Sequence, residues 1–297
     1  MRKCVSLLLI VLLMSFTGLT SVKSETANSS DIDDFFTDYA LVAPPEPINL
    51  PIILYHQISN KPSKLGAYVI TEEEFEHDLK LFKEKGFTTI TVADLIDFTN
   101  GKNEMPEKPI MLTFDDGAQS DYIYALPLLE KYEMKAVFFI VGKYTDEYSK
   151  PDVVKNVDYA HLCWDEVREM FRSEFVEFQS HSYELHENTL VGALPAKNEN
   201  DEEYSLRIKE DLGKLNSGLQ ENTGTTAIAF ACPFGCFNDR VKDAVRNAGF
   251  SVIFTSHQKI NTLSGDPEEL FSLGRYLRTH NKNMQNLIHS WDEFYNK

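Results

Sequence analysis

Two adjacent carboxylates stand where an expected strand ends. Asp115-Asp116-Gly117 directly follows the apolar run 110–114. Side-by-side carboxylates repel each other unless a cation offsets their charge. Asp-Gly pairs are also common turn formers, and taken alone this motif is better explained as a solvated turn.

A pair of histidines follows another expected strand, residues 175–179. His181 and His186 are five residues apart, so they converge only if the chain leaves the strand and turns. A lone histidine is more often a structural hydrogen-bonding group. Two imidazoles, one carboxylate and an open position, however, are the pattern of a catalytic Zn²⁺ site.

Two further strand ends carry polar or turn-forming residues. His56 follows the apolar run 52–55, and Cys232-Pro233-Phe234-Gly235 follows residues 227–231. The second motif is weak evidence by itself, because a plain turn explains it.

The elements that must position these residues alternate along the chain. Strands are expected at 51–55, 87–91, 110–114, 136–141, 175–179, 227–231 and 251–254, with a weaker one at 273–277. Helices are expected at 71–85, 92–98, 122–132, 164–171, 204–220 and 238–248. Alternation predicts an α/β fold with a parallel sheet, and closure into a barrel removes open edges. A doubly wound open sheet is the alternative.

Parallel barrels carry their chemistry just after the carboxyl ends of the strands, where all these motifs fall. No glycine-rich phosphate loop follows any expected strand, so no nucleotide is expected.

Together these motifs resemble those of the polysaccharide deacetylases, carbohydrate esterase family 4 with the NodB-homology domain. The resemblance runs from about residue 51 to at least 254 and rests on Thr113-Phe114-Asp115-Asp116-Gly117, His181-Ser182 with His186, and Pro233-Phe234-Gly235. It implies a distorted (β/α) barrel of about seven parallel strands in a single catalytic domain. It also implies one divalent metal ion and removal of acetyl groups from sugars.

The resemblance assigns a role to each matching residue. Asp116, His181 and His186 match the metal ligands, Asp115 matches the catalytic base, Phe234 matches the backbone N–H that helps to hold the oxyanion, and Pro233 and Gly235 shape that turn. Zn²⁺ is the expected ion, and Co²⁺ and Ni²⁺ suit the same ligand types.

The sequence departs from the family pattern at three places. The histidine spacing is five rather than four, which resembles the branch acting on poly-β-1,6-N-acetylglucosamine. Cys232 stands where the family often has an arginine that contacts the base, so another group must orient Asp115. The tryptophan-bearing motif of the family has no convincing match near residues 256–264.

The family's catalytic acid lies in a Leu-x-His motif, which occurs twice. Leu54-Tyr55-His56 ends the first strand of the domain, whereas Leu287-Ile288-His289 lies in a stretch with helical spacing, 284–294. The poly-N-acetylglucosamine branch resembles a circular permutation that moves this motif to the front. We therefore expect His56, rather than His289, to be the acid.

The expected function is metal-dependent N-deacetylation of a polysaccharide containing N-acetylglucosamine, either poly-N-acetylglucosamine or peptidoglycan. An O-deacetylase such as an acetylxylan esterase would have the same metal site. A non-catalytic carbohydrate-binding protein on this fold is a further alternative. A glycoside hydrolase is disfavoured, because its carboxylates stand about 5–9.5 Å apart and the histidines would have no role.

Composition limits the partners and the cellular context. The 297 residues carry a net charge of −17, which argues against binding nucleic acid. Residues 1–24 have the charge and apolar pattern of a signal peptide, so export to the cell envelope or medium is expected, with an uncleaved anchor as the alternative. Residues 25–48 are expected to be a flexible linker and 49–297 the catalytic domain, as a monomer.

The cysteines do not indicate a disulfide framework. Three remain after the signal segment: Cys163, Cys232 and Cys236. We expect buried, reduced side chains, although the last two are close enough in sequence to pair.

Overall fold

A computed structural model describes residues 46–187 and 192–295. The predicted signal segment and most of the predicted linker lie outside these residues. The strands are β1 (Ile48–Leu50), β2 (Ile52–Tyr55), β3 (Gln57–Ile58), β4 (Val69–Ile70), β5 (Thr88–Thr89), β6 (Pro109–Asp116), β7 (Ala136–Ile140), β8 (Val176–Ser180), β9 (Ala229–Ala231), β10 (Val252–Phe254), β11 (Asn261–Leu263) and β12 (Tyr276–Leu277). The helices are α2 (Glu72–Glu84), α3 (Val92–Thr99), α4 (Leu126–Tyr132), α5 (Gly142–Tyr148), α6 (Trp164–Met170), α7 (Asp201–Thr223), α8 (Asp239–Asn247), α9 (Met284–His289) and α10 (Asp292–Tyr295).

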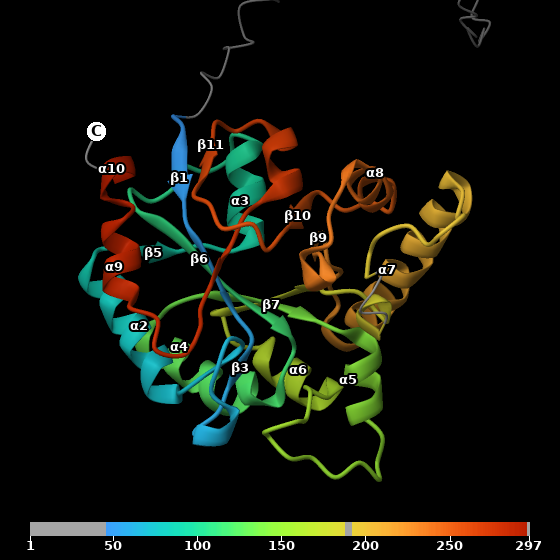
Figure 1. Cartoon of the computed structure of the whole chain (residues 1–297), viewed down its shortest axis with the longest axis horizontal. Coiled ribbons are helices and arrows are strands. Elements are labelled where there is room, and N and C mark those ends of the chain that lie inside the picture. Colours follow the sequence, from blue (N-terminus) through green and yellow to red (C-terminus); the bar gives the residue numbers. More distant parts are fainter. Residues whose placement is uncertain (1–45, 188–191, 296–297) are drawn as a thin grey trace, which may run out of the picture. The chain divides into compact units, whose positions relative to one another are not determined.

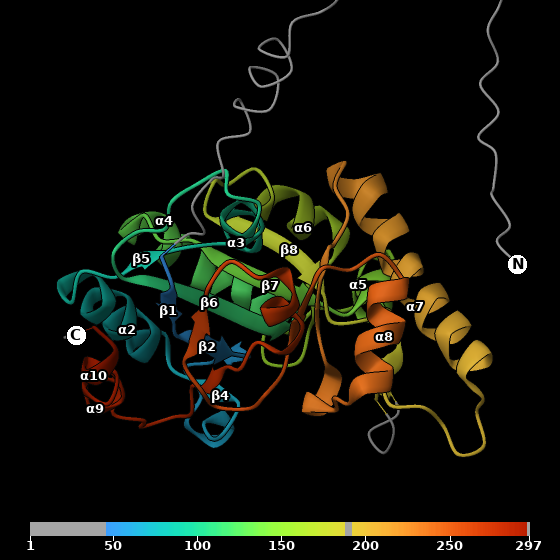
Figure 2. The same ribbon diagram turned by 90° about the horizontal axis from the view of Figure 1, so that it is seen from above.

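The main sheet is a curled, parallel one in which the strands from β2 to β10 follow the order of the sequence and β12 joins beside β2. Its strands run β10-β9-β8-β7-β6-β2-β12, and β5 pairs with β6 beside this path. A parallel bridge between Phe254 and Leu273 places the start of the β12 segment beside β10, so the two edges of the sheet approach each other. Figures 1 and 2 show helices such as α2, α4 and α7 around the outside of the sheet. The predicted distorted (β/α) barrel is confirmed, and the doubly wound alternative is wrong because the strand order never reverses.

The two faces of each strand serve two separate cores. Alternate residues of β7 divide between them: Phe138 packs with the outer helices, and Phe139 packs inside the barrel. On β6, Phe114 belongs to the outer core and Met111 to the inner one. Because side chains alternate along a strand, Asp115 shares the inner face with Met111.

Capping explains where several helices begin. Thr71 and Glu74 form the predicted capping box at the start of α2, and Asn238 caps α8 as expected. The expected strand 87–91 shrinks to β5, however, and the expected helix 122–132 begins with a π-helical turn over Asp121–Ala125 before α4.

Other elements had no sequence signal. Helix α5, the antiparallel pair β1–β11 and the short pair β3–β4 were not expected. Strand β1 begins at Ile48, inside the stretch expected to be linker, because it pairs with a strand more than 200 residues away. Such long-range pairing leaves no local pattern.

Two negative findings hold for the described part of the chain. Cys163, Cys232 and Cys236 are all free thiols, of which the first two are buried. No helix within residues 46–187 and 192–295 is long and apolar enough to cross a membrane.

Candidate metal centre

Strand β6 delivers both carboxylates to the carboxyl edge of the sheet. Asp115 is buried and points inward, whereas Asp116 is half-buried. The backbone turns sharply at Asp116, with φ of 72°, so the two side chains diverge. Gly117 permits this turn, because a Cβ there would lie 2.9 Å from Ile140 Cγ2.

The two histidines meet Asp116 from the end of β8. His181 Nε2 is 3.4 Å and His186 Nε2 is 3.2 Å from Asp116 Oδ1. One ligand atom from each of the three residues lies within 4.8 Å of the others. The chain leaves the strand at Ser182, whose φ is 90°, and a 3₁₀ turn over Leu185–Glu187 brings back His186. The five-residue spacing thus converges as predicted.

Hydrogen bonds orient these groups for a cation. His181 Nδ1–H donates to the Ala231 carbonyl at 2.9 Å, so its Nε2 presents a lone pair to the cluster. Asp116 Oδ1 is buried and accepts no hydrogen bond from the described residues. Burial opposes the ionisation of Asp116. While the two imidazoles carry a proton they hold the pKa of Asp116 well below its ordinary value, and where they are neutral a bound cation would supply the positive charge in their place. An ionised, unsatisfied oxygen facing two imidazole nitrogens fits a divalent metal ion.

A buried arginine orients Asp115. Arg275 Nη1 and Nη2 donate to the two Asp115 carboxylate oxygens at 2.7 Å each, and Arg275 Nε donates to the Thr255 carbonyl at 3.1 Å. Burial opposes ionisation, but the charges of Arg275 and His181 lower the pKa of Asp115. Arg275 therefore makes the contact to Asp115 that the family often makes with an arginine at the position of Cys232.

His56 lies in the same cleft, and His289 does not. The cleft has a volume of about 580 Å³ and is lined by residues that include His56, Asp115, Phe234 and Arg275. The His56 ring packs edge-on against Tyr68, and its Nδ1 is buried without a partner among the described residues. His289 is on α9, exposed, and paired with Asp292 at 2.6 Å. The assignment of the acid role to His56 stays a prediction.

The turn after β9 forms another wall of the cleft. Phe234 adopts a left-handed conformation with φ of 59°, and its ring lies 4.5 Å from that of His186. Gly235 also has a positive φ, and a Cβ there would clash with Ser256 Oγ at 1.9 Å. Pro233 is buried behind the cleft. The structure thus gathers all eight predicted site residues at one end of the sheet.

Sequence reasoning missed several supporting residues. Arg275 lies in the weak strand region, and an arginine between apolar residues was the one available signal. His161 Nδ1–H donates to the Asp116 carbonyl at 3.0 Å, and Tyr68 covers His56. Both come from loops without any motif.

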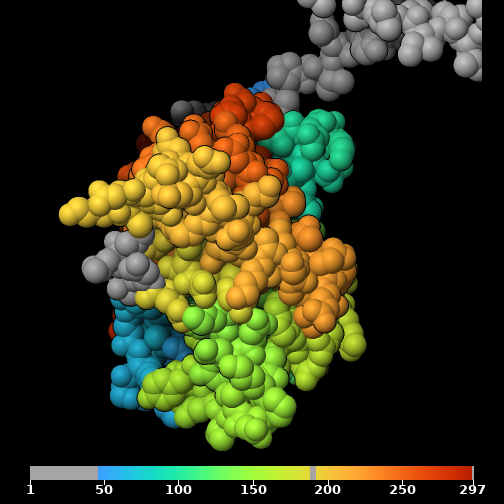
Figure 3. Space-filling model, turned by 90° about the vertical axis from the view of Figure 1, so that its right-hand side faces the viewer, coloured from blue at the N-terminus to red at the C-terminus, as the bar shows by residue number. Residues whose placement is uncertain are grey.

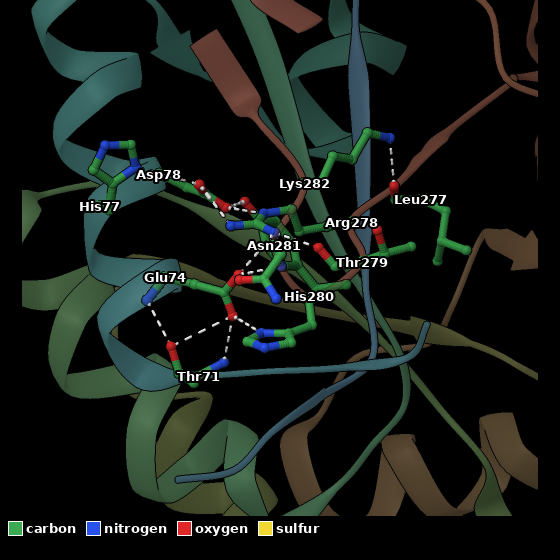
Figure 4. Close-up of polar contacts among 11 residues, drawn as sticks. Thr71, Glu74, His77, Asp78, Leu277, Arg278, Thr279, His280, Asn281 and Lys282 are labelled. Carbon is green, nitrogen blue, oxygen red and sulfur yellow. Dashed lines mark hydrogen bonds and ion pairs between the residues drawn. The ribbon is translucent and has the colours of Figure 1, made fainter. Parts of the chain in front are cut away.

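A second buried arginine, Arg278, follows the short strand β12, whereas Arg275 directly precedes it. Arg278 Nε and Nη2 donate to the Asp78 carboxylate of α2 at 2.6 and 3.2 Å (Figure 4). Tyr55 Oη donates to the same carboxylate at 3.1 Å. The Arg278 N–H also donates to the Leu54 carbonyl at 2.9 Å. The end of β12 is therefore tied both to α2 and to the strand that leads into His56.

A histidine–carboxylate cluster at the carboxyl edge of a (β/α) barrel is the arrangement of a metal-ion hydrolase. The family model described as polysaccharide deacetylase matches residues 102–253, just over half of the chain, and the chain belongs to this family.

Relatives with known names support this placement. Poly-β-1,6-N-acetyl-D-glucosamine N-deacetylase of Escherichia coli K12 is 25% identical over 93% of this chain, which spans only 43% of that relative. The enzyme of the same name from Staphylococcus aureus MSSA476 is 25% identical over 82% of this chain and 78% of its own length. The solved structure of a de-N-acetylase from Aggregatibacter actinomycetemcomitans has a TM-score of 0.70 and 26% identity, covering 82% of this chain and 99% of that one.

Proposed function

We propose that this protein is a hydrolase that removes N-acetyl groups from a polysaccharide containing N-acetylglucosamine. One observation carries the proposal: a cluster suited to a metal, Asp116 with His181 and His186, stands beside a buried carboxylate held by an arginine. The names of the relatives favour poly-β-1,6-N-acetylglucosamine over peptidoglycan as the polymer.

The three ligands fit one divalent ion, which we propose to be Zn²⁺. Two imidazoles and a carboxylate with open positions suit catalytic zinc, and Co²⁺ and Ni²⁺ accept the same donors. When bound, such an ion supplies Lewis-acid chemistry, lowering the pKa of a water and polarising an acetyl carbonyl.

Asp115 and His56 each carry out one of the two proton transfers of the proposed reaction. Asp115 is the general base, since its lowered pKa keeps it ionised near neutral pH to take a proton from the attacking water. His56 gives a proton to the departing sugar nitrogen. Burial lowers the pKa of His56 and the nearby carboxylates partly offset this, so its protonated form is a strong donor. The Phe234 backbone N–H helps to hold the negative charge that develops on the carbonyl oxygen.

The geometry weighs against a glycoside hydrolase. Both oxygens of Asp115 are engaged by Arg275, and Asp116 faces the two histidines. Neither carboxylate is placed to flank a glycosidic bond across from the other.

The cellular setting is also part of the proposal. The charged and apolar pattern of residues 1–24 supports export, so that the chain meets its polymer at the cell envelope or outside the cell. We propose that it acts there as a monomer. The net charge of −17 disfavours nucleic acid as a partner.

Acetate release tests the substrate. The full chain, loaded with Zn²⁺, is incubated with β-1,6-linked N-acetylglucosamine oligomers, chitin oligomers, peptidoglycan and acetylated xylan. We expect the fastest acetate release from the β-1,6 oligomer. Faster release from acetylated xylan would replace the proposal with an O-deacetylase, and binding without any release would indicate a non-catalytic protein.

A further inference from the structure

The loop between the two histidines must hold its shape without regular structure. It leaves β8 at Ser182, in a left-handed conformation that costs energy in a non-glycine residue. Regular structure resumes only at Leu185, where a 3₁₀ turn begins. The separation of the two Nε2 atoms therefore depends on how Tyr183 and Glu184 are held.

One carboxylate on α7 holds both of these residues. Asp211 Oδ1 accepts the Tyr183 N–H at 2.8 Å, and Asp211 Oδ2 accepts the Glu184 N–H at 2.9 Å. Asp211 is 8% exposed, so these bonds are largely shielded from water. Two successive N–H groups aimed at one anion form a nest, and each such charge-assisted bond is stronger than a neutral one.

Helix α5, which packs against α7, holds the loop through two further backbone bonds. The Gly142 N–H donates to the Ser182 carbonyl at 3.1 Å, and the Lys143 N–H donates to the Tyr183 carbonyl at 2.9 Å. A Cβ on Gly142 would lie 2.6 Å from the Tyr183 ring, so the loop lies tightly against this helix. Figure 3 shows the side of the molecule that presents α7, in gold, in its upper part and the light green region that contains α5 below it. Both helices thus hold the loop. Asp211 accepts two of its N–H groups, and Ser180 Oγ at the end of β8 accepts a third, the Ser182 N–H, at 3.1 Å.

We propose that Asp211 is a positioning residue for the metal site: by clamping the loop between His181 and His186, it sets the separation of the two imidazoles and hence the affinity for the ion. This inference rests on the proposed metal-dependent function. Groups that orient metal ligands from the outer shell change metal affinity by about 10–100-fold when removed. Without Asp211, two partly buried N–H groups lose their acceptor and the loop relaxes toward a less strained path.

The same helix offers a matched control. Asn216 of α7 also ties a backbone segment, because its Oδ1 accepts the Ala227 N–H at 2.8 Å and its Nδ2 donates to the Ala227 carbonyl at 3.1 Å. That tie holds the segment leading into β9 and does not touch the histidine loop. A variant at Asn216 therefore shows how much zinc affinity and stability change when a bond from α7 outside the histidine loop is lost.

The experiment measures zinc affinity rather than activity. Metal-free full chains of the wild type, Asp211→Ala, Asp211→Asn and Asn216→Ala are titrated with Zn²⁺ against a chromophoric chelator, and urea unfolding of each metal-free chain gives its stability. We expect Asp211→Ala to raise the zinc Kd about 10–100-fold, Asp211→Asn to raise it less because one acceptor oxygen remains, and Asn216→Ala to leave it within about twofold.

Two results would overturn the inference. One is a wild-type zinc Kd in Asp211→Ala or, if that variant does not fold, in Asp211→Asn. The other is an equal loss of affinity in Asn216→Ala at matched stability. If the wild type itself binds no metal ion, the proposed function fails instead, and the two failures are distinguished.

Discussion

Two buried arginine–carboxylate pairs, three residues apart on one segment, have different roles. Arg275 meets Asp115 with two bonds of 2.7 Å, and Arg278 meets Asp78 with bonds of 2.6 and 3.2 Å. In both pairs each partner's side chain is at most 4% exposed. The two pairs are chemically alike, so their roles must come from their surroundings.

What faces each carboxylate differs. Asp115 borders the cleft that also holds His56, and burial is outweighed there by the positive charge around it, so its pKa is lowered. Asp78 is enclosed by Arg278 and the Tyr55 hydroxyl, and burial outweighs these partners, so its pKa is raised. In the proposed mechanism Asp115 can act as the base because one side of its carboxylate faces the cleft, whereas Asp78 has no such open side.

The largest expected effect comes from neutralising Asp115 in the Arg275–Asp115 pair, which faces the cleft (the open pair). Asp115→Asn keeps the size of the side chain but removes the base, so we expect kcat for acetate release to fall about 10³-fold. Zinc content, measured by elemental analysis, should stay at the wild-type level, because Asp115 is not a ligand. A variant with near-normal kcat would remove Asp115 from the mechanism.

Neutralising Asp78 in the enclosed Arg278–Asp78 pair (the closed pair) should instead reduce the stability of the fold. Asp78→Asn removes the nearer counter-charge of the buried Arg278 and leaves it the Glu74 carboxylate at 3.4 Å, so the free energy of unfolding is expected to fall by about 3 kcal/mol. Urea unfolding measures this change. Acetate release per folded molecule should stay within about threefold of the wild type. A kcat loss as large as that of Asp115→Asn, in a folded protein, would contradict the division of roles.

A conservative change in each arginine sharpens the comparison. Arg275→Lys removes the bidentate contact with Asp115, and kcat is expected to fall about 10-fold. The guanidinium favours the ionised form of Asp115, so weakening it raises the pKa of Asp115. The acidic limb of the kcat/KM profile should therefore move to higher pH.

Arg278→Lys is the control for this shift, because its carboxylate does not take part in the reaction. Its acidic limb should coincide with that of the wild type. Equal shifts in both variants would mean that the limb reports general loosening of β12 rather than the ionisation of Asp115.

The smallest effect is expected at the rim of the closed pair. Burial opposes the ionisation of Glu74, but bonds from the Thr71 N–H, His280 and the Asn281 N–H lower its pKa from 4.5 to about 2. A lowered carboxyl pKa stabilises the fold above the unfolded value, and this stabilisation is lost as pH falls from about 4.5 to about 2. Allowing for solvent screening, Glu74→Gln should cost about 1 kcal/mol at pH 7.

Urea unfolding at pH 7 and at pH 3 measures this dependence. The difference between wild type and Glu74→Gln should be smaller at pH 3. The exposed Glu73 of the same helix turn is the control, and Glu73→Gln should change little at either pH. An undiminished difference at pH 3 would contradict the lowered pKa.

Features that depend on local sequence patterns could be predicted, whereas features that depend on contacts between distant residues could not. Strands β2, β6 and β8 were predicted to within two residues because apolar runs are local patterns, although β6 continues through Asp115 and Asp116 rather than ending before them. The convergence of His181 and His186 on Asp116 was predicted because parallel strands end at one edge. Arg275 and Asp211 were missed because each bonds to a partner 27 or more residues away in the sequence, and no local pattern encodes such a contact.

The central claim is that acetate release depends on one metal ion held by Asp116, His181 and His186. The most direct test titrates Zn²⁺ into the metal-free chain while acetate release from a β-1,6-linked N-acetylglucosamine oligomer is measured. The account predicts no release without metal and a rate that saturates at one zinc per chain. Undiminished release from the chelated, metal-free protein would contradict it.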